Sequence, residues 1–107
     1  MNLVDSSGWL EYFADGPNAK FFAPPLEAIA ELIVPTISIY EVFKRILQQR
    51  GEDAALQAAA LMQQGYVVEL TAPISLAAAR ISMDRKIPMA DSIILATANT
   101  YGASLWT

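Results

Sequence analysis

Short, uninterrupted apolar runs recur along this chain and are separated by longer segments with a different pattern. The runs are residues 2–5, 32–35, 66–70 and 104–106. A continuous apolar run of this length is typical of a strand that is buried on both faces of a sheet. We therefore predict four short strands.

The segments between these runs carry apolar residues at helical spacing. The clearest case is a stripe at i, i+3, i+4, i+7 and i+8 that starts at Ile39, in a helix that Gly51 closes. Pro73 and Pro88 are predicted to start two later helices, the second of which runs to Gly102. The other predicted helical segments are residues 9–13, 26–31 and 52–64.

Glycine and proline pairs interrupt the region between the first two strands. Gly16-Pro17 is predicted to end the first helix. We expect residues 18–23 to form only a short turn, because Pro24-Pro25 should break a helix at that point.

Strands that alternate with helices indicate an α/β fold with a parallel sheet covered on both faces. In such sheets ligands bind beyond the carboxyl ends of the strands, so candidate chemistry is sought at that edge.

The composition limits what that chemistry can be. The chain has 107 residues, of which 54% are hydrophobic, a size and content that favour one domain with one core. It contains neither Cys nor His, which excludes zinc fingers, disulfide frameworks and His-based catalytic triads. No apolar run is long enough to span a bilayer and nothing resembles an export signal, so we expect a cytoplasmic protein without a membrane segment.

The net charge of −4 argues against a protein that holds nucleic acid by bulk electrostatics. The basic residues are nevertheless grouped, at positions 44–50 and 80–86. These groups are either a local positive rim or ordinary solvated helix faces.

Two acidic residues at the predicted edge have structural as well as chemical explanations. Asp5 ends the first strand and precedes a helix, where it could cap free N–H groups. Glu41 stands three residues after Ser38, the spacing of a capping box, and could pair with Arg45 one turn later.

Asp91 is harder to explain structurally. It shares a helix face with Ile94, Leu95 and Ala98, so we expect it to continue a buried row. A buried carboxylate needs compensation from donors, from a cation such as Arg85, or from a metal ion. An oxygen-only cluster suits Mg²⁺ or Mn²⁺, and such a site is suited to phosphodiester hydrolysis by metal-activated water.

Three motifs together resemble the PIN-domain ribonucleases, specifically the VapC-type toxins of toxin–antitoxin pairs. They are Leu3-Val4-Asp5-Ser6-Ser7-Gly8-Trp9, the segment from Thr36 to Val42, and the segment from Pro88 to Ala98. The resemblance implies a three-layer α/β/α sandwich with a central, mostly parallel sheet of four to five strands. It also implies a Mg²⁺-dependent (or Mn²⁺-dependent) endoribonuclease whose catalytic and metal-binding acids are Asp5, Glu41 and Asp91, supported by Ser7.

The same resemblance implies partners and exposes one departure from the family pattern. It predicts an RNA substrate, a homodimer and an antitoxin protein whose tail blocks the acidic pocket. The family carries a further acid in a T-x-D pattern; Thr107 matches the threonine, but no acid follows it in this sequence. We therefore expect residues 1–107 to be a single PIN domain truncated at its C-terminus.

A catalytically silent PIN-fold interaction module is the alternative. The missing acid supports it. The aromatic residues also support it if they form a binding surface, although they could equally be ordinary core. They are Trp9, Phe13, Phe21 and Phe22.

Overall fold

Four parallel strands form the central sheet of the molecule, in the order β3-β2-β1-β4. The computed structural model describes all residues from 1 to 107. The strands are β1 (Asn2–Val4), β2 (Leu32–Pro35), β3 (Tyr66–Val68) and β4 (Ser104–Trp106). All four predicted strands are confirmed, although the first and third are shorter than expected.

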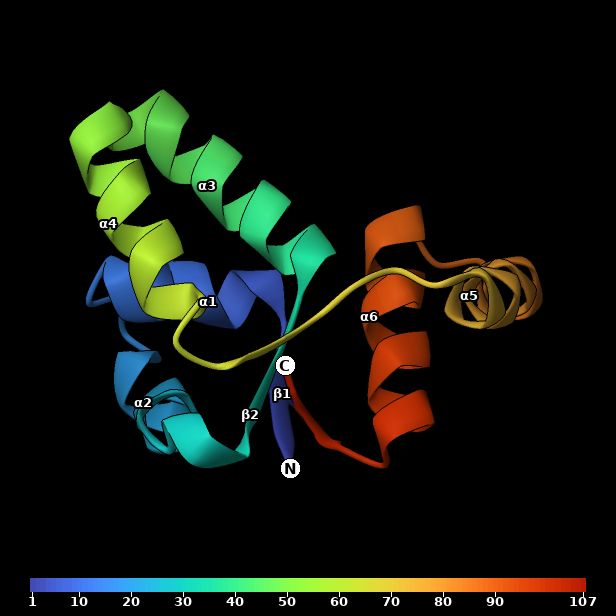
Figure 1. Cartoon of the computed structure of the whole chain (residues 1–107). Helices are drawn as coiled ribbons and strands as arrows, with labels where there is room; N and C mark the ends of the chain where they lie inside the picture. Colours follow the sequence, from blue (N-terminus) through green and yellow to red (C-terminus); the bar gives the residue numbers. More distant parts are fainter.

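Helices cover both faces of this sheet. In Figure 1, α1 to α4 lie on one side of the strands, and α5 and α6 lie on the other. The arrangement is a three-layer α/β/α sandwich, which confirms the predicted fold class. The helices are α1 (Ser6–Phe13), α2 (Ala19–Glu27), α3 (Thr36–Arg50), α4 (Glu52–Met62), α5 (Ala72–Arg85) and α6 (Met89–Tyr101), with a short 3₁₀ helix, η1 (Ile29–Glu31), before β2.

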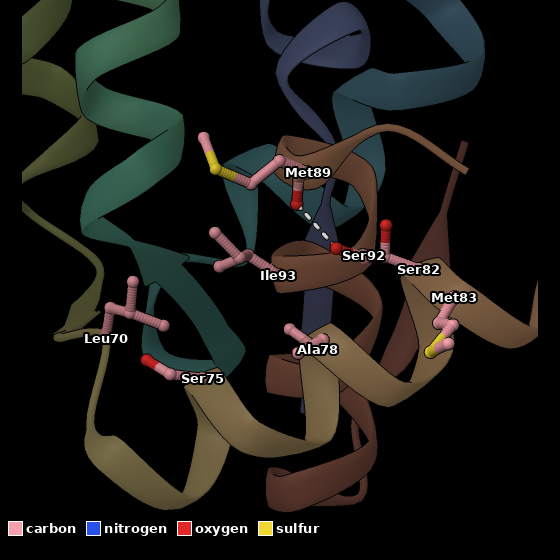
Figure 2. A pocket seen from close by; sticks show the side chains of 9 residues that line it. Leu70, Ser75, Ala78, Ser82, Met83, Met89, Ser92 and Ile93 are labelled. Atoms are coloured by element: carbon pink, nitrogen blue, oxygen red, sulfur yellow. Dashed lines mark hydrogen bonds between the residues drawn. The ribbon is translucent and has the colours of Figure 1, made fainter. Parts of the chain in front are cut away.

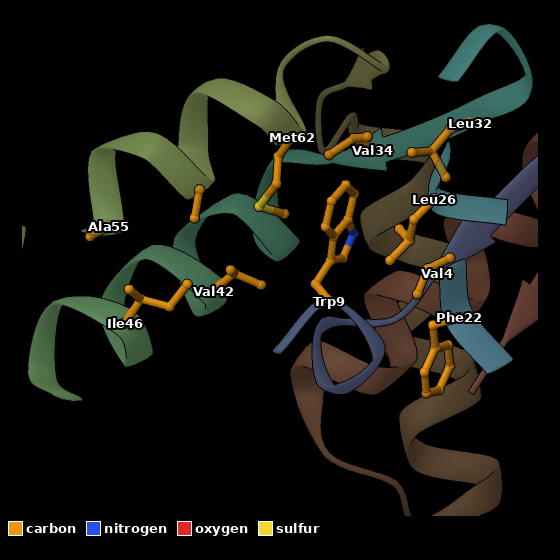
Figure 3. Packing of buried hydrophobic residues seen from close by; sticks show 11 residues of the cluster. Val4, Trp9, Phe22, Leu26, Leu32, Val34, Val42, Ile46, Ala55 and Met62 are labelled. Carbon is orange, nitrogen blue, oxygen red and sulfur yellow. The ribbon is translucent and has the colours of Figure 1, made fainter. Parts of the chain in front are cut away.

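Side chains of consecutive strand residues point to opposite faces of the sheet and so divide the core in two. Val4, Leu32 and Val34 belong to the larger cluster, which packs against α1 to α4. Figure 3 shows the indole of Trp9 inside this cluster. The opposite faces of β1, β2 and β3 contribute Leu3, Ile33 and Val68 to a second cluster with Ile94 and Ala98 of α6. Every one of these residues is buried, and full burial of each large side chain contributes about 1.5 to 3 kcal/mol.

The first helix approaches the sheet closely because Gly8 has no side chain. A Cβ atom at that position would lie 2.5 Å from Cγ1 of Val4 and 2.8 Å from Cδ1 of Phe22. The close approach fixes α1 directly after β1, at the carboxyl edge of the sheet.

The expectation that Pro24-Pro25 breaks the chain into a turn is wrong. Both prolines lie inside α2, which continues to Glu27 and closes with the Ala28 N–H donating to the Pro24 carbonyl at 3.2 Å. A proline removes one helical hydrogen bond. Here the loss is outweighed by tertiary burial, because Pro25 and its neighbour Leu26 are both buried.

Residues 26–31, predicted as one helical segment, are divided at Ala28 between the end of α2 and the 3₁₀ helix η1. The ends of α3 and α6 and the start of α5 follow the sequence signals. Gly51 ends α3 at φ 88° and Gly102 ends α6 at φ 61°, left-handed conformations that glycine adopts without strain. Thr71 caps α5 by accepting a hydrogen bond from the Ile74 N–H. None of the helices has the length and apolar character needed to cross a membrane.

Candidate active site

The carboxyl edge of the sheet carries a pocket of about 360 Å³ that all three predicted acids line. Asp5 follows β1, Glu41 lies in the second turn of α3 after β2, and Asp91 lies in the first turn of α6. The Asp5 N–H donates to the Trp106 carbonyl at 3.1 Å, which ties the ends of β1 and β4 together. The pocket is lined by Asp5, Ser6, Ser7, Leu10, Glu41, Arg45 and Asp91.

Asp5 has the capping role that its position allows, and one carboxylate oxygen is enough to fill it. Oδ1 of Asp5 accepts hydrogen bonds from the Gly8 N–H and from the Ser7 hydroxyl, each at 2.8 Å. Asp5 is thus the N-cap of α1 and is only half-buried. Because both bonds use Oδ1, Oδ2 remains available to a ligand in the pocket.

Glu41 accepts a hydrogen bond from Ser6 and does not form the capping box with Ser38 that the sequence allowed. Its Oε1 accepts from the Ser6 hydroxyl at 2.6 Å, a contact between α1 and α3. Ser38 is fully buried and its hydroxyl has no hydrogen-bond partner. The capping box does not form because α3 already begins at Thr36, after Pro35, so Ser38 lies inside the first turn.

The prediction that Asp91 continues a buried row is wrong, because its side chain is exposed. The row does become buried one turn further along α6, where Ile94 is only 2% exposed. Within the first turn Ser92 is buried, whereas Asp91 faces water and the pocket. The desolvation cost that favoured a compensating cation at this residue therefore does not apply.

The pocket also includes residues whose contribution the sequence did not reveal. Ser6 is buried and orients Glu41, and Arg45 supplies the only cation among the lining residues. Arg85, the cation that the sequence offered to Asp91, does not line the pocket. The sequence shows Ser6 directly after Asp5 at the start of a predicted helix, but it does not show that the hydroxyl reaches Glu41, 35 residues away.

Both supporting residues lie at this edge. Ser7 donates to Asp5 and lines the acidic pocket. Thr107 lines an adjoining pocket of about 290 Å³ together with Asp5 and Asp91. Asp5 and Asp91 therefore line two adjoining pockets, whereas Glu41 lines only the first.

The donor set fits a hard divalent cation, although the side chains are not gathered around a single point. No group of three or more acidic side chains lies close enough to ligate one ion directly. Magnesium keeps several waters when proteins bind it, so each acid could contact the ion directly or through water. All the candidate ligands are oxygens, and oxygens of Asp5 and Glu41 remain free of hydrogen bonds within the chain. The metal assignment stays a prediction.

A larger pocket, about 490 Å³, lies elsewhere, between α5 and α6. Figure 2 shows that apolar and hydroxyl side chains line it, including Leu70, Met83 and Met89. It contains no acidic or basic residue, so it offers no group for acid, base or metal chemistry.

Known proteins share this architecture. The chain superimposes on a toxin–antitoxin complex from Klebsiella pneumoniae with a TM-score of 0.81 and 20% identity, over 100% of this chain and 85% of the other. It superimposes on VapC20 of Mycobacterium tuberculosis, a toxin that cleaves the sarcin–ricin loop, with a TM-score of 0.80 and 17% identity, over 96% and 85% of the two chains. No curated protein matches the chain in sequence. The family model of the PIN domain matches residues 3–107, the span that contains all three acids, and the chain therefore belongs to the PIN-domain family.

Proposed function

We propose that this protein is a Mg²⁺-dependent endoribonuclease of the VapC toxin type. One observation carries the proposal: Asp5, Glu41 and Asp91 come from three separate segments of a PIN-domain chain and line one pocket at the carboxyl edge of the sheet. An oxygen-rich pocket at this edge suits a magnesium ion and, through it, a phosphodiester.

The chain's own residues prepare this pocket for an anionic substrate. The Ser7 hydroxyl and the Gly8 N–H fix Asp5, and the Ser6 hydroxyl fixes Glu41, so both carboxylates are oriented before substrate arrives. Arg45 lines the same pocket and offers a guanidinium to a phosphate. When bound, Mg²⁺ supplies a Lewis acid that lowers the pKa of water and offsets charge on phosphate oxygens.

Isosteric substitutions test the three acids separately from the fold. Asp5→Asn and Glu41→Gln keep the oxygens that accept hydrogen bonds from α1, and Asp91→Asn changes an exposed side chain. Each variant should fold normally but lose more than about 100-fold in RNA cleavage with Mg²⁺, since it removes charge from the site. Asp84→Asn, an exposed acid on α5, is the matched control and should cleave like the parent. Undiminished cleavage in the three site variants would overturn the proposal.

An antitoxin protein and a second copy of the chain are the proposed partners. The Klebsiella pneumoniae neighbour is described as a toxin–antitoxin complex, which supports a protein inhibitor for this chain. An inhibitor that covers the acidic pocket should protect Asp91, which is exposed in the free chain, from carbodiimide labelling. Sedimentation equilibrium tests the homodimer, and a monomer mass at high concentration would remove it.

A catalytically silent interaction module is the second candidate, and one observation favours it. The acids share a pocket, yet no three of them lie close enough to hold one ion directly. This candidate predicts that the folded protein binds a partner protein while RNA stays intact at every Mg²⁺ concentration. Cleavage that depends on Asp5, Glu41 and Asp91 excludes it.

A further inference from the structure

A separate pocket of about 450 Å³ adjoins the acidic pocket, and we call it the aromatic pocket. Ser7 lines both, and Thr107 lines both the aromatic pocket and the adjoining pocket that contains Asp5 and Asp91. The aromatic pocket thus adjoins both pockets that contain the acids. Its lining residues are Ser7, Glu11, Asn18, Phe21, Phe22 and Thr107.

Phe21 presents an aromatic surface to solvent in this pocket. Its side chain is 53% exposed, whereas the neighbouring Phe22 is only 7% exposed and belongs to the core. The Phe21 ring meets Phe22 edge-on, with centroids 4.9 Å apart and an interplanar angle of 83°. It also contacts Trp106 with centroids 5.3 Å apart and an angle of 54°. The ring is therefore exposed but held in place, so a ligand that stacks on it orders little further.

We propose that the aromatic pocket binds an unpaired nucleobase of the RNA whose scissile phosphate lies at Asp5, Glu41 and Asp91. This inference rests on the proposed ribonuclease function. Bases of single-stranded RNA stack on exposed aromatic side chains, and stacking tolerates any sequence because every base has a π face. A base is neutral, so Glu11 and the net charge of −4 do not repel it as they would repel a phosphate. The volume lies within the range of small-molecule sites, about 300 to 1,000 Å³.

A further pocket at this edge carries two cations, which a phosphate backbone requires, together with Glu11, which also lines the aromatic pocket. Its volume is about 260 Å³, and it shares Ser7 and Arg45 with the acidic pocket and adds Arg50. Arg45 lies about one turn beyond Glu41 on α3, and Arg50 lies about two and a half turns beyond it.

An RNA strand that reaches the acids thus finds Arg45 and Arg50 in one neighbouring pocket and the Phe21 ring in another. This gives the basic group at positions 44–50 a role in binding the phosphate backbone. RNA binding then does not depend on the net charge of the whole protein, which is −4.

Asn18 adds a group that can read the edge of the base. Its backbone N–H donates to Oε1 of Glu11 at 2.9 Å, while its side chain makes no capping bond to α2. The free amide can both donate and accept hydrogen bonds, as a base edge does. We therefore expect Asn18→Ala to alter base preference at the stacked position and to leave the overall stacking intact.

Fluorescence of 2-aminopurine measures the stacking directly. The probes are short single-stranded RNAs that carry one 2-aminopurine at successive positions, mixed with the protein in chelator so that no cleavage occurs. Stacking on Phe21 requires no cation. One position should be quenched on binding, and Phe21→Leu should abolish that quenching and weaken the Kd by about 5- to 150-fold. Phe21→Trp should retain both.

Two controls keep the result specific to the aromatic pocket. Tyr66→Leu removes an aromatic side chain that is 59% exposed on β3, at the other edge of the sheet from β4, and should bind like the parent. An abasic residue at the quenched position perturbs only the RNA. It should weaken binding to the parent by the same factor and have little effect on Phe21→Leu.

The outcomes separate this inference from the ribonuclease proposal. Equal affinities for the parent, Phe21→Leu and Tyr66→Leu, with no quenched position, would overturn the aromatic pocket as a base site. If Mg²⁺ then still gives cleavage that depends on Asp91, the ribonuclease proposal stands without it. Quenching that depends on Phe21, with no cleavage in Mg²⁺, keeps the base site and removes the enzymatic proposal.

Discussion

Gly8→Ala tests the close packing of α1 on the sheet, on which the position of Asp5 depends. Two opposing effects decide the outcome. Replacing glycine by alanine inside a helix stabilises it by about 1 kcal/mol when there is space for the methyl group. Here the added Cβ would lie 2.5 Å from Cγ1 of Val4 and 2.8 Å from Cδ1 of Phe22, both closer than the 3.0 Å that real Cβ contacts essentially never fall below.

The neighbours of Gly8 cannot move aside easily. Val4 is fully buried in β1 and Phe22 is 7% exposed, so relief of the contact must shift α1 or repack the core. Overpacking of this kind costs about 1 to 3 kcal/mol, which exceeds the helix-propensity gain. We expect a net loss of about 1 to 2 kcal/mol in the free energy of unfolding, and a fall in Tm of roughly 5 to 10 °C.

Urea denaturation followed by tryptophan fluorescence measures this loss, because Trp9 is only 3% exposed. The midpoint should fall while the m-value stays constant. Val4→Ala removes the atom that the new methyl group would meet first, so Gly8→Ala should cost less in that background. An increase of about 1 kcal/mol in both backgrounds would refute the packing argument.

Three further substitutions test individual contacts. Ser38→Ala should leave the free energy of unfolding unchanged or raise it by about 1 kcal/mol, because the buried hydroxyl has no hydrogen-bond partner. A decrease of about 1 kcal/mol in a denaturation experiment would instead indicate that Ser38 forms the capping box. Asp5→Ala should unfold about 1 kcal/mol more easily than Asp5→Asn, since only asparagine keeps the cap on Gly8, and equal midpoints would contradict this. Burial and the hydrogen bond to Glu27 raise the pKa of Tyr12 above its ordinary value. The folded protein therefore favours the neutral phenol. The resulting contribution to stability is complete below about pH 10, the pKa in the unfolded chain, and is lost as the pH rises through the raised pKa of the folded protein. Tyr12→Phe should remove that extra loss of stability at high pH, and pH-dependent denaturation curves that coincide for the two proteins would count against it.

The sequence predicted the strands and the helix ends where local signals and tertiary burial agree. Leu32 to Pro35 is a fully buried strand that reads as one apolar run, and Gly51 and Gly102 end their helices with the positive φ that glycine permits. Such signals are local, so they can be recognised in the sequence without knowing which residues pack against them.

The errors occur where neighbours distant in sequence decide the outcome. Pro24-Pro25 should break a helix on local grounds, but burial of Leu26 and Phe22 holds α2 together. Asp91 lies on an apolar row, yet it is exposed while Ile94, one turn further along α6, is buried. Helical periodicity gives the direction of a side chain but not the extent of the surface that covers it.

The candidate site shows the same division. Asp5 and Glu41 follow the ends of two parallel strands, and Asp91 lies at the start of the helix that leads into β4, so all three were expected at one edge. The structure brings them to one pocket. The hydroxyl that orients Glu41 comes from Ser6, 35 residues earlier in the chain. Contacts between elements of this kind depend on how α1 and α3 pack, which no local pattern specifies.

Metal removal and replacement tests the central claim most directly. RNA is incubated with the parent protein in chelator, after which Mg²⁺ is added in excess, with Asp91→Asn treated in parallel. We expect intact RNA in chelator, cleavage on addition of Mg²⁺ to the parent, and no recovery with Asp91→Asn. Cleavage that persists in chelator, or equal recovery in both proteins, would contradict a metal-dependent ribonuclease at this pocket.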